Sequence, residues 1–240
     1  MWTAAELRHS RVRLGGTVWR AVEAQHQTST RRLVDTAAEQ VRLEELLEGT
    51  KPAYPSGAQR LDYLLASPFR YGNPHGSRFR PGGQRWGIFY AGETVHVALA
   101  ELAYHRMRFF LASAGTPLPR QSATLTVFAV RYATAAGLDL SRLPFAEYQS
   151  RWTDPGSYAH TQKLGVTAVE AEIDALRYRS ARTREAQYNV AIFAVQAFAD
   201  DRPRTRQTWY LYLGDQEATA FRALAGTREH HAFARSDWAL

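Results

Sequence analysis

Residues 76–106 read GSRFRPGGQRWGIFYAGETVHVALAELAYHR, and they contain clear signals of a loop, a strand and a helix. Its short apolar run at 88–91 predicts a strand. A turn at 92–94 follows, in which Thr94 is placed to cap a helix over about 95–113. The loop before this strand starts at residue 68, and it is polar and glycine-rich. A loop of this length inside a compact domain is usually functional.

Further strands are expected downstream of this unit. The segment 124–132 alternates apolar and polar residues, and the segments 190–199 and 208–214 are short apolar runs. The segment 168–180 suggests a helix or a strand edge. Strands and helices intermingle without a regular βαβ rhythm, so the sequence predicts an α+β class with a mixed sheet core and flanking helices.

Upstream of this unit, residues 17–50 contain no proline and no glycine before Gly49, and their apolar residues recur at helical spacing. One or two helices are expected there. Two prolines and a glycine interrupt the pattern at 51–57. The sequence therefore predicts a helical N-terminal extension over 1–60 and a second domain over 61–240.

Composition excludes several classes of protein. The 240 residues are 45% hydrophobic, which suits a globular domain, and the absence of cysteine excludes disulfides, thiolate metal sites and a cysteine nucleophile. No apolar run is long enough to span a bilayer, and the N-terminus lacks the apolar core of a signal peptide. We expect a cytoplasmic protein without a membrane partner.

Net charge is +7, and arginine supplies 28 of the 30 basic residues. Arginine binds phosphate bidentately and stacks on flat rings, so nucleic acid, a nucleotide or an acidic protein could be the partner. The arginines are scattered rather than gathered in one run, which is equally consistent with a compositional preference for arginine.

Common catalytic motifs, including the phosphate-binding loop, GxGxxG, GxSxG and HExxH, are absent. His96, Glu101 and His105 share the expected helix. His96 and Glu101 are five residues apart and point about 140° away from each other, so we expect no metal site. Glu101 and His105 are four apart and share a face, either as a surface pair or as part of a site.

The loop before that helix interleaves basic and aromatic side chains. Its arginines are Arg70, Arg78, Arg80 and Arg85, and the aromatic residues among them are Phe69, Tyr71, Phe79, Trp86 and Tyr90. This combination suits a ligand with phosphates and flat rings, such as a dinucleotide.

These blocks resemble the RES-domain family. The similarity lies in residues 76–106 and, much later, in YRSARTREAQYNVAIF at 178–193; the segment at 19–48 and PFRY at 68–71 resemble longer members. The resemblance implies a fold related to ADP-ribosyltransferase toxins. It also implies the toxin of a bacterial toxin–antitoxin system that acts on NAD by phosphorolysis, hydrolysis or ADP-ribosyl transfer, with NAD as substrate rather than cofactor.

The resemblance also implies the residues of the site. The family arginine, aromatic residue, glutamate and serine fall on Arg78, Tyr90, Glu101 and Ser180, and a histidine and an asparagine found in some members fall on His105 and Asn189. Phe79 stands where some members have tyrosine.

In this interpretation Glu101 stabilises the oxocarbenium-like centre that forms when the nicotinamide–ribose bond breaks. Arg78 clamps the pyrophosphate. Tyr90 stacks on nicotinamide or is simply a core residue of the strand, and Ser180 donates to a phosphate or is a turn residue. His105 binds the ligand or only holds Glu101 in place.

Arg70, Arg80 and Arg85 are expected to be loop residues or to face an antitoxin that covers the active cleft. The alternative to a toxin is an arginine-rich nucleic-acid-binding protein or nuclease, which would show strongly salt-dependent binding.

Overall fold

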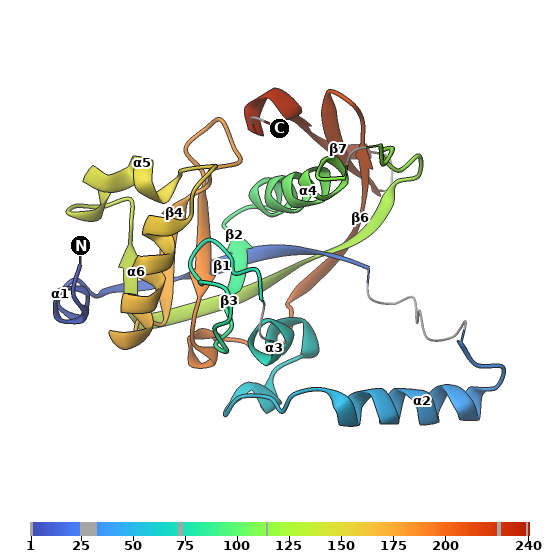
Figure 1. Ribbon diagram of the computed structural model, residues 1–240, viewed down its shortest axis with the longest axis horizontal. Coiled ribbons are helices and arrows are strands. Elements are labelled where there is room, and N and C mark those ends of the chain that lie inside the picture. The colour runs from blue at the N-terminus through green and yellow to red at the C-terminus, as the bar shows by residue number, and fades with distance from the viewer. Residues whose placement is uncertain (1, 25–32, 72–73, 114, 225–226, 239) are drawn as a thin grey trace.

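The computed structural model describes all residues except 1, 25–32, 72–73, 114, 225–226 and 239 (Figure 1). Its helices are α1 (Ala4–His9), α2 (Ala37–Thr50), α3 (Tyr63–Arg70), α4 (Val95–Leu111), α5 (Gln149–Trp152) and α6 (Ala159–Glu170). Its strands are β1 (Val12–Glu23), β2 (Phe89–Gly92), β3 (Ala123–Asp139), β4 (Ala175–Arg179), β5 (Tyr188–Ile192), β6 (Thr205–Leu213), β7 (Glu217–Leu224) and β8 (Thr227–Ala234).

The strands form one sheet in the order β1-β2-β5-β4-β3-β6-β7-β8, and β1 also pairs with β3. This additional pairing closes β1, β2, β5, β4 and β3 into a ring, from which β6, β7 and β8 continue as an antiparallel meander. The strands β3 and β4 run parallel, whereas their neighbours pair antiparallel. The predicted mixed α+β class is therefore confirmed.

Helices cover this sheet through separate apolar clusters. The helix α3 packs on β1, β2, β3 and β5, while α1, α5 and α6 pack around β4. The helix α4 packs on β6, β7 and β8 through residues such as Met107 and Trp209, both fully buried. In Figure 1 the loop before β2 lies between α6 and α4. This arrangement brings that loop, α4 and the start of α6 to one place.

The strand–turn–helix unit has the predicted form. The strand β2 ends at Gly92, and the Thr94 side chain accepts a hydrogen bond from the Val97 amide at 3.2 Å, which caps α4. The Cβ of any larger residue at 92 would lie 2.7 Å from the Cβ of Val97. Glycine at this position therefore lets the helix begin directly against the strand.

Part of the helical prediction for residues 17–50 is wrong, and its part over 25–32 lies outside the described residues. Residues up to Glu23 form β1, whereas α2 is a helix as expected. The reason is tertiary, because β1 pairs with β3 along the stretch from Val12 to Glu23, more than a hundred residues away in sequence. The apolar run at 190–199 forms a strand only as far as Ile192, where β5 ends.

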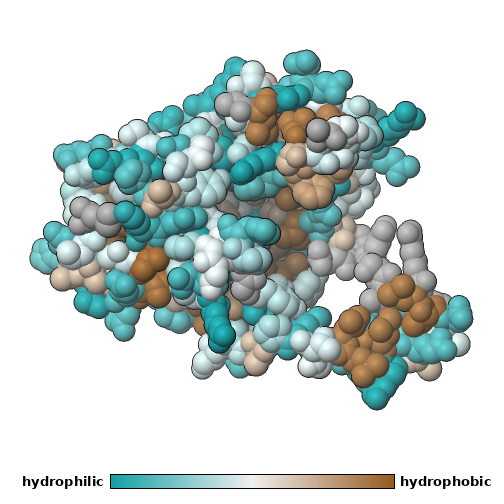
Figure 2. Space-filling view, in the orientation of Figure 1, coloured by the Kyte–Doolittle hydropathy of each residue, from teal (hydrophilic) through white to brown (hydrophobic). Residues whose placement is uncertain are grey.

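The helix α2 projects from the body of the protein in Figure 1 and has no buried residue. Figure 2 shows hydrophobic side chains gathered on it, and Val41, Leu46 and Leu47 are exposed. The strand β1 lies within the first sixty residues and belongs to the central sheet. The division of the chain at residue 60 stays a prediction. Among the described helices, none has the length and apolar character needed to cross a bilayer.

Candidate active site

A cavity of about 580 Å³ lies between the loop before β2, the α4 helix and the start of α6. Five of the six predicted site residues, Arg78, Tyr90, Glu101, His105 and Asn189, line it. The sixth, Ser180, is buried behind Glu101 and touches it through a hydrogen bond. The structure therefore brings together residues that the sequence places up to 111 positions apart.

Glu101 is fixed through one of its two carboxylate oxygens. Its Oε1 accepts hydrogen bonds from Ser180 Oγ at 3.0 Å and from Asn189 Nδ2 at 2.6 Å, and both donors belong to residues that are 2% exposed. The other oxygen, Oε2, has no hydrogen-bond partner in the described part of the chain. One oxygen is thus anchored while the other remains available to a ligand.

The sheet register explains how Asn189 reaches Glu101. In the β2–β5 pair Asn189 lies opposite Gly92, the residue on which α4 begins. Glu101 lies in the second turn of that helix, so its side chain returns to the same strand end. Strand pairing and the helix cap therefore jointly set the position of the carboxylate.

Ser180 is already committed to this arrangement. Its Oγ accepts a hydrogen bond from the Arg182 amide at 3.1 Å and donates its only proton to Glu101. The hydroxyl therefore positions the carboxylate in this structure. The sequence suggested that Ser180 donates to a phosphate. While the bond to Glu101 is present, the hydroxyl has no free proton for that donation.

Arg78 is held by backbone carbonyls and by an aromatic ring. Its Nη1 donates to the carbonyls of Trp152 at 3.0 Å and Asp154 at 3.1 Å. Its guanidinium lies 4.6 Å from the ring centroid of Tyr158, the residue before α6. These contacts leave Nε and Nη2 without hydrogen-bond partners among the described residues, so they can serve a ligand.

Tyr90 uses its hydroxyl to hold the loop that carries Arg78. The oxygen accepts a hydrogen bond from the Phe79 amide at 3.1 Å and lies 2.8 Å from Ser77 Oγ. Burial raises the pKa of Tyr90 to about 12, so the phenol stays neutral at physiological pH. Whether its ring also stacks on a ligand stays a prediction.

His105 lies at the exposed edge of the cavity. No hydrogen bond joins it to Glu101 in the part of the chain that the structure describes. Partial withdrawal from water lowers the pKa of His105, and the negative charge of Glu101 opposes that effect. The role of holding Glu101 falls to Ser180 and Asn189 instead.

Two of the three arginines expected to be loop residues or to face an antitoxin have little-exposed side chains. Arg80 is 6% exposed and donates to the Trp86 carbonyl at 3.0 Å. The Arg70 side chain is 7% exposed and pairs with Glu48 of α2. Only Arg85 of the three is exposed. Arg70 and Arg80 thus fasten the loop and α2 to the body rather than offering a docking surface.

Sequence reasoning missed three residues of this site. Arg20 of β1 lines the cavity and donates to the Tyr90 carbonyl at 3.0 Å, and burial lowers its pKa to about 10. Tyr158 lines the cavity, and Arg182 contacts it from behind. Arg182 could be noticed beside Ser180, but no local pattern marks Arg20 or Tyr158, because their partners are distant in sequence.

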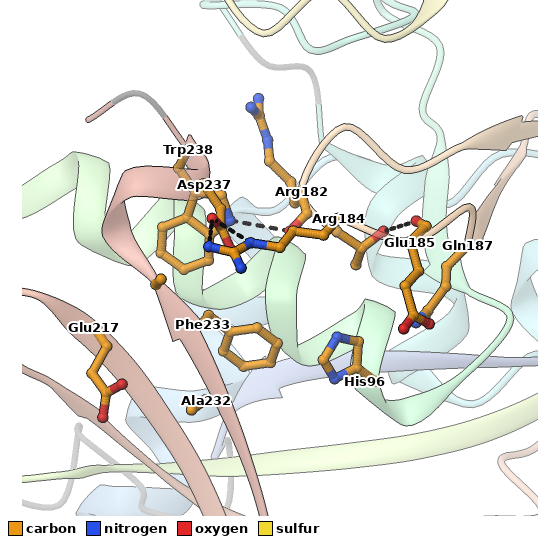
Figure 3. Close-up of a pocket in the computed structure, with 12 residues that line it drawn as sticks. His96, Arg182, Arg184, Glu185, Gln187, Glu217, Ala232, Phe233, Asp237 and Trp238 are labelled. Atoms are coloured by element: carbon orange, nitrogen blue, oxygen red, sulfur yellow. Dashed lines mark hydrogen bonds and ion pairs between the residues drawn. The ribbon is translucent and has the colours of Figure 1, made fainter.

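A second cavity of about 510 Å³ is lined by residues of the loop before β5, of β8 and of the segment after it (Figure 3). Arg184 pairs there with Asp237, and His96 packs against Phe233. His96 therefore lines a different cavity from Glu101. None of the predicted site residues lines this second cavity.

Together, the fold and the site define a class of α+β protein in which one anchored carboxylate faces a cavity lined by arginines. Residues 53–214 match the model of the RES domain, and the chain belongs to this family. The match begins before α3 and ends after β6, so β7 and β8 extend the sheet beyond it.

Among solved structures, the chain is similar to one in the crystal structure of the M. tuberculosis MbcT–MbcA toxin–antitoxin complex. The TM-score is 0.51 at 12% identity, over 85% of this chain and 91% of that one. This likeness supports the fold. A search of curated proteins found no sequence that matches.

Proposed function

We propose that this protein is the toxin of a toxin–antitoxin pair and that it cleaves NAD at the nicotinamide–ribose bond. The observation that carries the proposal is the anchored Glu101, whose Oε1 is fixed by Ser180 and Asn189 while Oε2 is available in a cavity lined by arginines. Membership of the RES domain family supports the same chemistry.

The geometry suits this reaction. When the C–N bond between ribose and nicotinamide breaks, its electron pair leaves with neutral nicotinamide, and positive charge develops on the ribose. Oε2 of Glu101 stabilises that charge. An acceptor then donates a lone pair to the ribose carbon and loses a proton; phosphate, water or a protein side chain can each serve as this acceptor.

Arg78 serves the phosphates of the substrate. Its Nη1 is bound to two carbonyls, so the planar fork is held in place with Nε and Nη2 available. A guanidinium held in this way matches two phosphate oxygens, whereas a lysine offers a single point charge.

The decisive experiment is release of free nicotinamide from NAD by the purified chain, compared with Glu101→Gln. Loss of a preorganised charge should lower turnover on the order of 10²- to 10³-fold. The fold should survive, because an amide still accepts from Ser180 and Asn189. Glu185→Gln, which changes an exposed carboxylate in the second cavity, is the matched control and should retain parental turnover.

Retention of near-parental turnover by Glu101→Gln would remove Glu101 from the mechanism. The products identify the acceptor, since phosphorolysis gives a phosphorylated ADP-ribose, hydrolysis gives ADP-ribose, and transfer gives a modified protein.

The proposed partner is a cognate antitoxin that covers the active cleft. The solved relative was crystallised as a toxin–antitoxin complex, and in this chain the cavity opens at the exposed edge formed by His105 and Arg108. Expression of the chain alone should deplete cellular NAD and stop growth, whereas the Glu101→Gln chain should be tolerated. Equal growth arrest by both chains would separate toxicity from NAD cleavage.

A further inference from the structure

Arg182 is a buried cation without a carboxylate partner. It is 3% exposed and its guanidinium stacks on the Tyr104 ring at 3.4 Å. Within the described residues no carboxylate lies within ion-pair distance of it, and its Nε and Nη1 have no hydrogen-bond partner. Burial of an unpaired charge is costly, so proteins normally supply an anion nearby.

Among the described residues, one side-chain acceptor contacts Arg182, and it leads to the active cavity. Its Nη2 donates to the Tyr158 hydroxyl at 3.2 Å, and Tyr158 lines that cavity. The guanidinium itself points away from the second cavity, as Figure 3 shows. Arg182 is a lining residue of the second cavity and not of the active one, so its positive charge acts on the active cavity through Tyr158.

Tyr158 has an uncommitted proton. Its hydroxyl oxygen accepts from Arg182, and a phenol carries one proton to donate. No acceptor for that proton occurs among the described residues. The guanidinium of Arg78 lies over the face of the Tyr158 ring. Tyr158 is thus placed between two cations and offers one free donor to the cavity.

The charges around the cavity favour an oxyanion at this donor. Arg20, Arg78 and Arg108 line the cavity, and Glu101 is the only carboxylate among its described lining residues. Since Glu101 is oriented by Ser180 and Asn189, it does not neutralise Arg182. A ligand that carries several negative charges would balance this excess.

We propose that Tyr158 and Arg182 form an oxyanion subsite, in which Tyr158 contacts a phosphate oxygen and Arg182 is the positioning residue behind it. The inference rests on the proposed function and adds a second phosphate anchor to Arg78. The phosphate belongs either to the dinucleotide or to free inorganic phosphate, and the experiment distinguishes the two.

The test is calorimetric titration of the full chain carrying Glu101→Gln, which slows turnover enough for binding to be measured. NAD, inorganic phosphate and inorganic pyrophosphate are titrated separately, with and without Tyr158→Phe. Loss of a hydrogen bond to a charged group should weaken binding about tenfold. Weaker NAD binding assigns the subsite to the dinucleotide, and weaker binding of inorganic phosphate alone assigns it to free phosphate.

Tyr104→Phe is the matched control. It keeps the ring on which Arg182 stacks and removes a hydroxyl that does not line the cavity. Affinities for all three probes should stay at the parental level. Adenosine, which has no phosphate, should bind the Tyr158→Phe chain as it binds the parent.

Arg182→Gln should weaken the same probe as Tyr158→Phe, and Arg182→Lys should restore part of the loss. The two changes should be strongly non-additive, because Arg182 acts through Tyr158. A general packing defect at the buried arginine would instead weaken adenosine as well. If Arg182→Gln does not fold, Tyr158→Phe still decides the question.

Unchanged affinity of the Tyr158→Phe chain for NAD, phosphate and pyrophosphate would overturn the subsite and leave NAD cleavage standing. In the converse case the parent releases no nicotinamide while pyrophosphate binding still depends on Tyr158. That result would reject the proposed function and retain the subsite.

Discussion

Glu101, Ser180 and Asn189 act as a unit at the level of single residues. Ser180 and Asn189 both donate to Oε1, at 3.0 and 2.6 Å, and both are buried. A carboxylate fixed in this way needs no reorganisation when positive charge develops beside it. Sequence reasoning found all three residues through a family resemblance, but it expected Ser180 to donate to a phosphate or to be a turn residue. The hydrogen-bond direction became visible only in the structure.

Ser180→Ala separates these two roles. Removal of one donor to Oε1 should lower kcat about tenfold, the usual scale for a hydrogen bond to a charged group. The KM for NAD should change little, because the Ser180 proton is committed to Glu101. Asn189→Ala should give the same pattern.

Steady-state kinetics at several phosphate concentrations check this prediction. A large rise in KM for NAD or for phosphate, with kcat preserved, would return Ser180 to the phosphate-binding role.

At the level of elements, the sequence predicted the local units and missed the distant pairings. The helix cap at Thr94 and the strand before it depend on residues that are neighbours in the sequence, and the structure has both. The strand β1 was predicted as helix because its pairing with β3 depends on residues far along the chain. Tyr158 escaped notice for the same reason, since its partners Arg78 and Arg182 lie in other elements.

The contact between α6 and the loop before β2 gives a test at this scale. Gly165 lies against the Phe79 carbonyl so closely that an added Cβ would collide with that oxygen. Gln162 of the same helix donates to the Ser77 carbonyl at 3.0 Å. The helix α6 therefore supports the loop that carries Arg78.

Gly165→Ala should separate helix and loop. Alanine in a helix interior normally gains about 1 kcal/mol over glycine. Overpacking typically costs about 1–3 kcal/mol, so the clash should decide the sign. We expect a lower free energy of unfolding in urea and reduced NAD turnover, because Arg78 moves with the loop.

Gly156→Ala is the matched control for that change, since a Cβ there would meet only Asp154 Oδ1 at 3.7 Å. Its stability and turnover should equal those of the parent. Parental turnover in Gly165→Ala would show that the loop does not depend on α6.

Across the whole molecule, some arginines make ion pairs and ring contacts within the fold, while many others are exposed. Asp200 holds both Arg131 and Arg204, which lowers the pKa of that carboxyl. Arg177 binds Glu93 and Asp139 and stacks 3.6 Å from the Tyr188 ring centroid. Pairs of this kind occupy many guanidinium groups across the described structure. The net charge of +7 therefore does not by itself identify a nucleic-acid surface.

The last prediction separates an NAD-cleaving enzyme from a nucleic-acid binder. Duplex DNA should bind this chain weakly, and its affinity should fall steeply between about 50 and 200 mM salt, because exposed phosphate contacts release counterions. NAD turnover should change far less over that range. Salt screens exposed charges beyond a Debye length of about 10 Å at 0.1 M, but it screens charges in an enclosed site much less. Fluorescence anisotropy with labelled duplex and the nicotinamide assay measure the two responses in the same buffers. Tight, sequence-selective DNA binding at physiological salt, with no nicotinamide released at any phosphate concentration, would favour the nucleic-acid interpretation and reject the site built around Glu101.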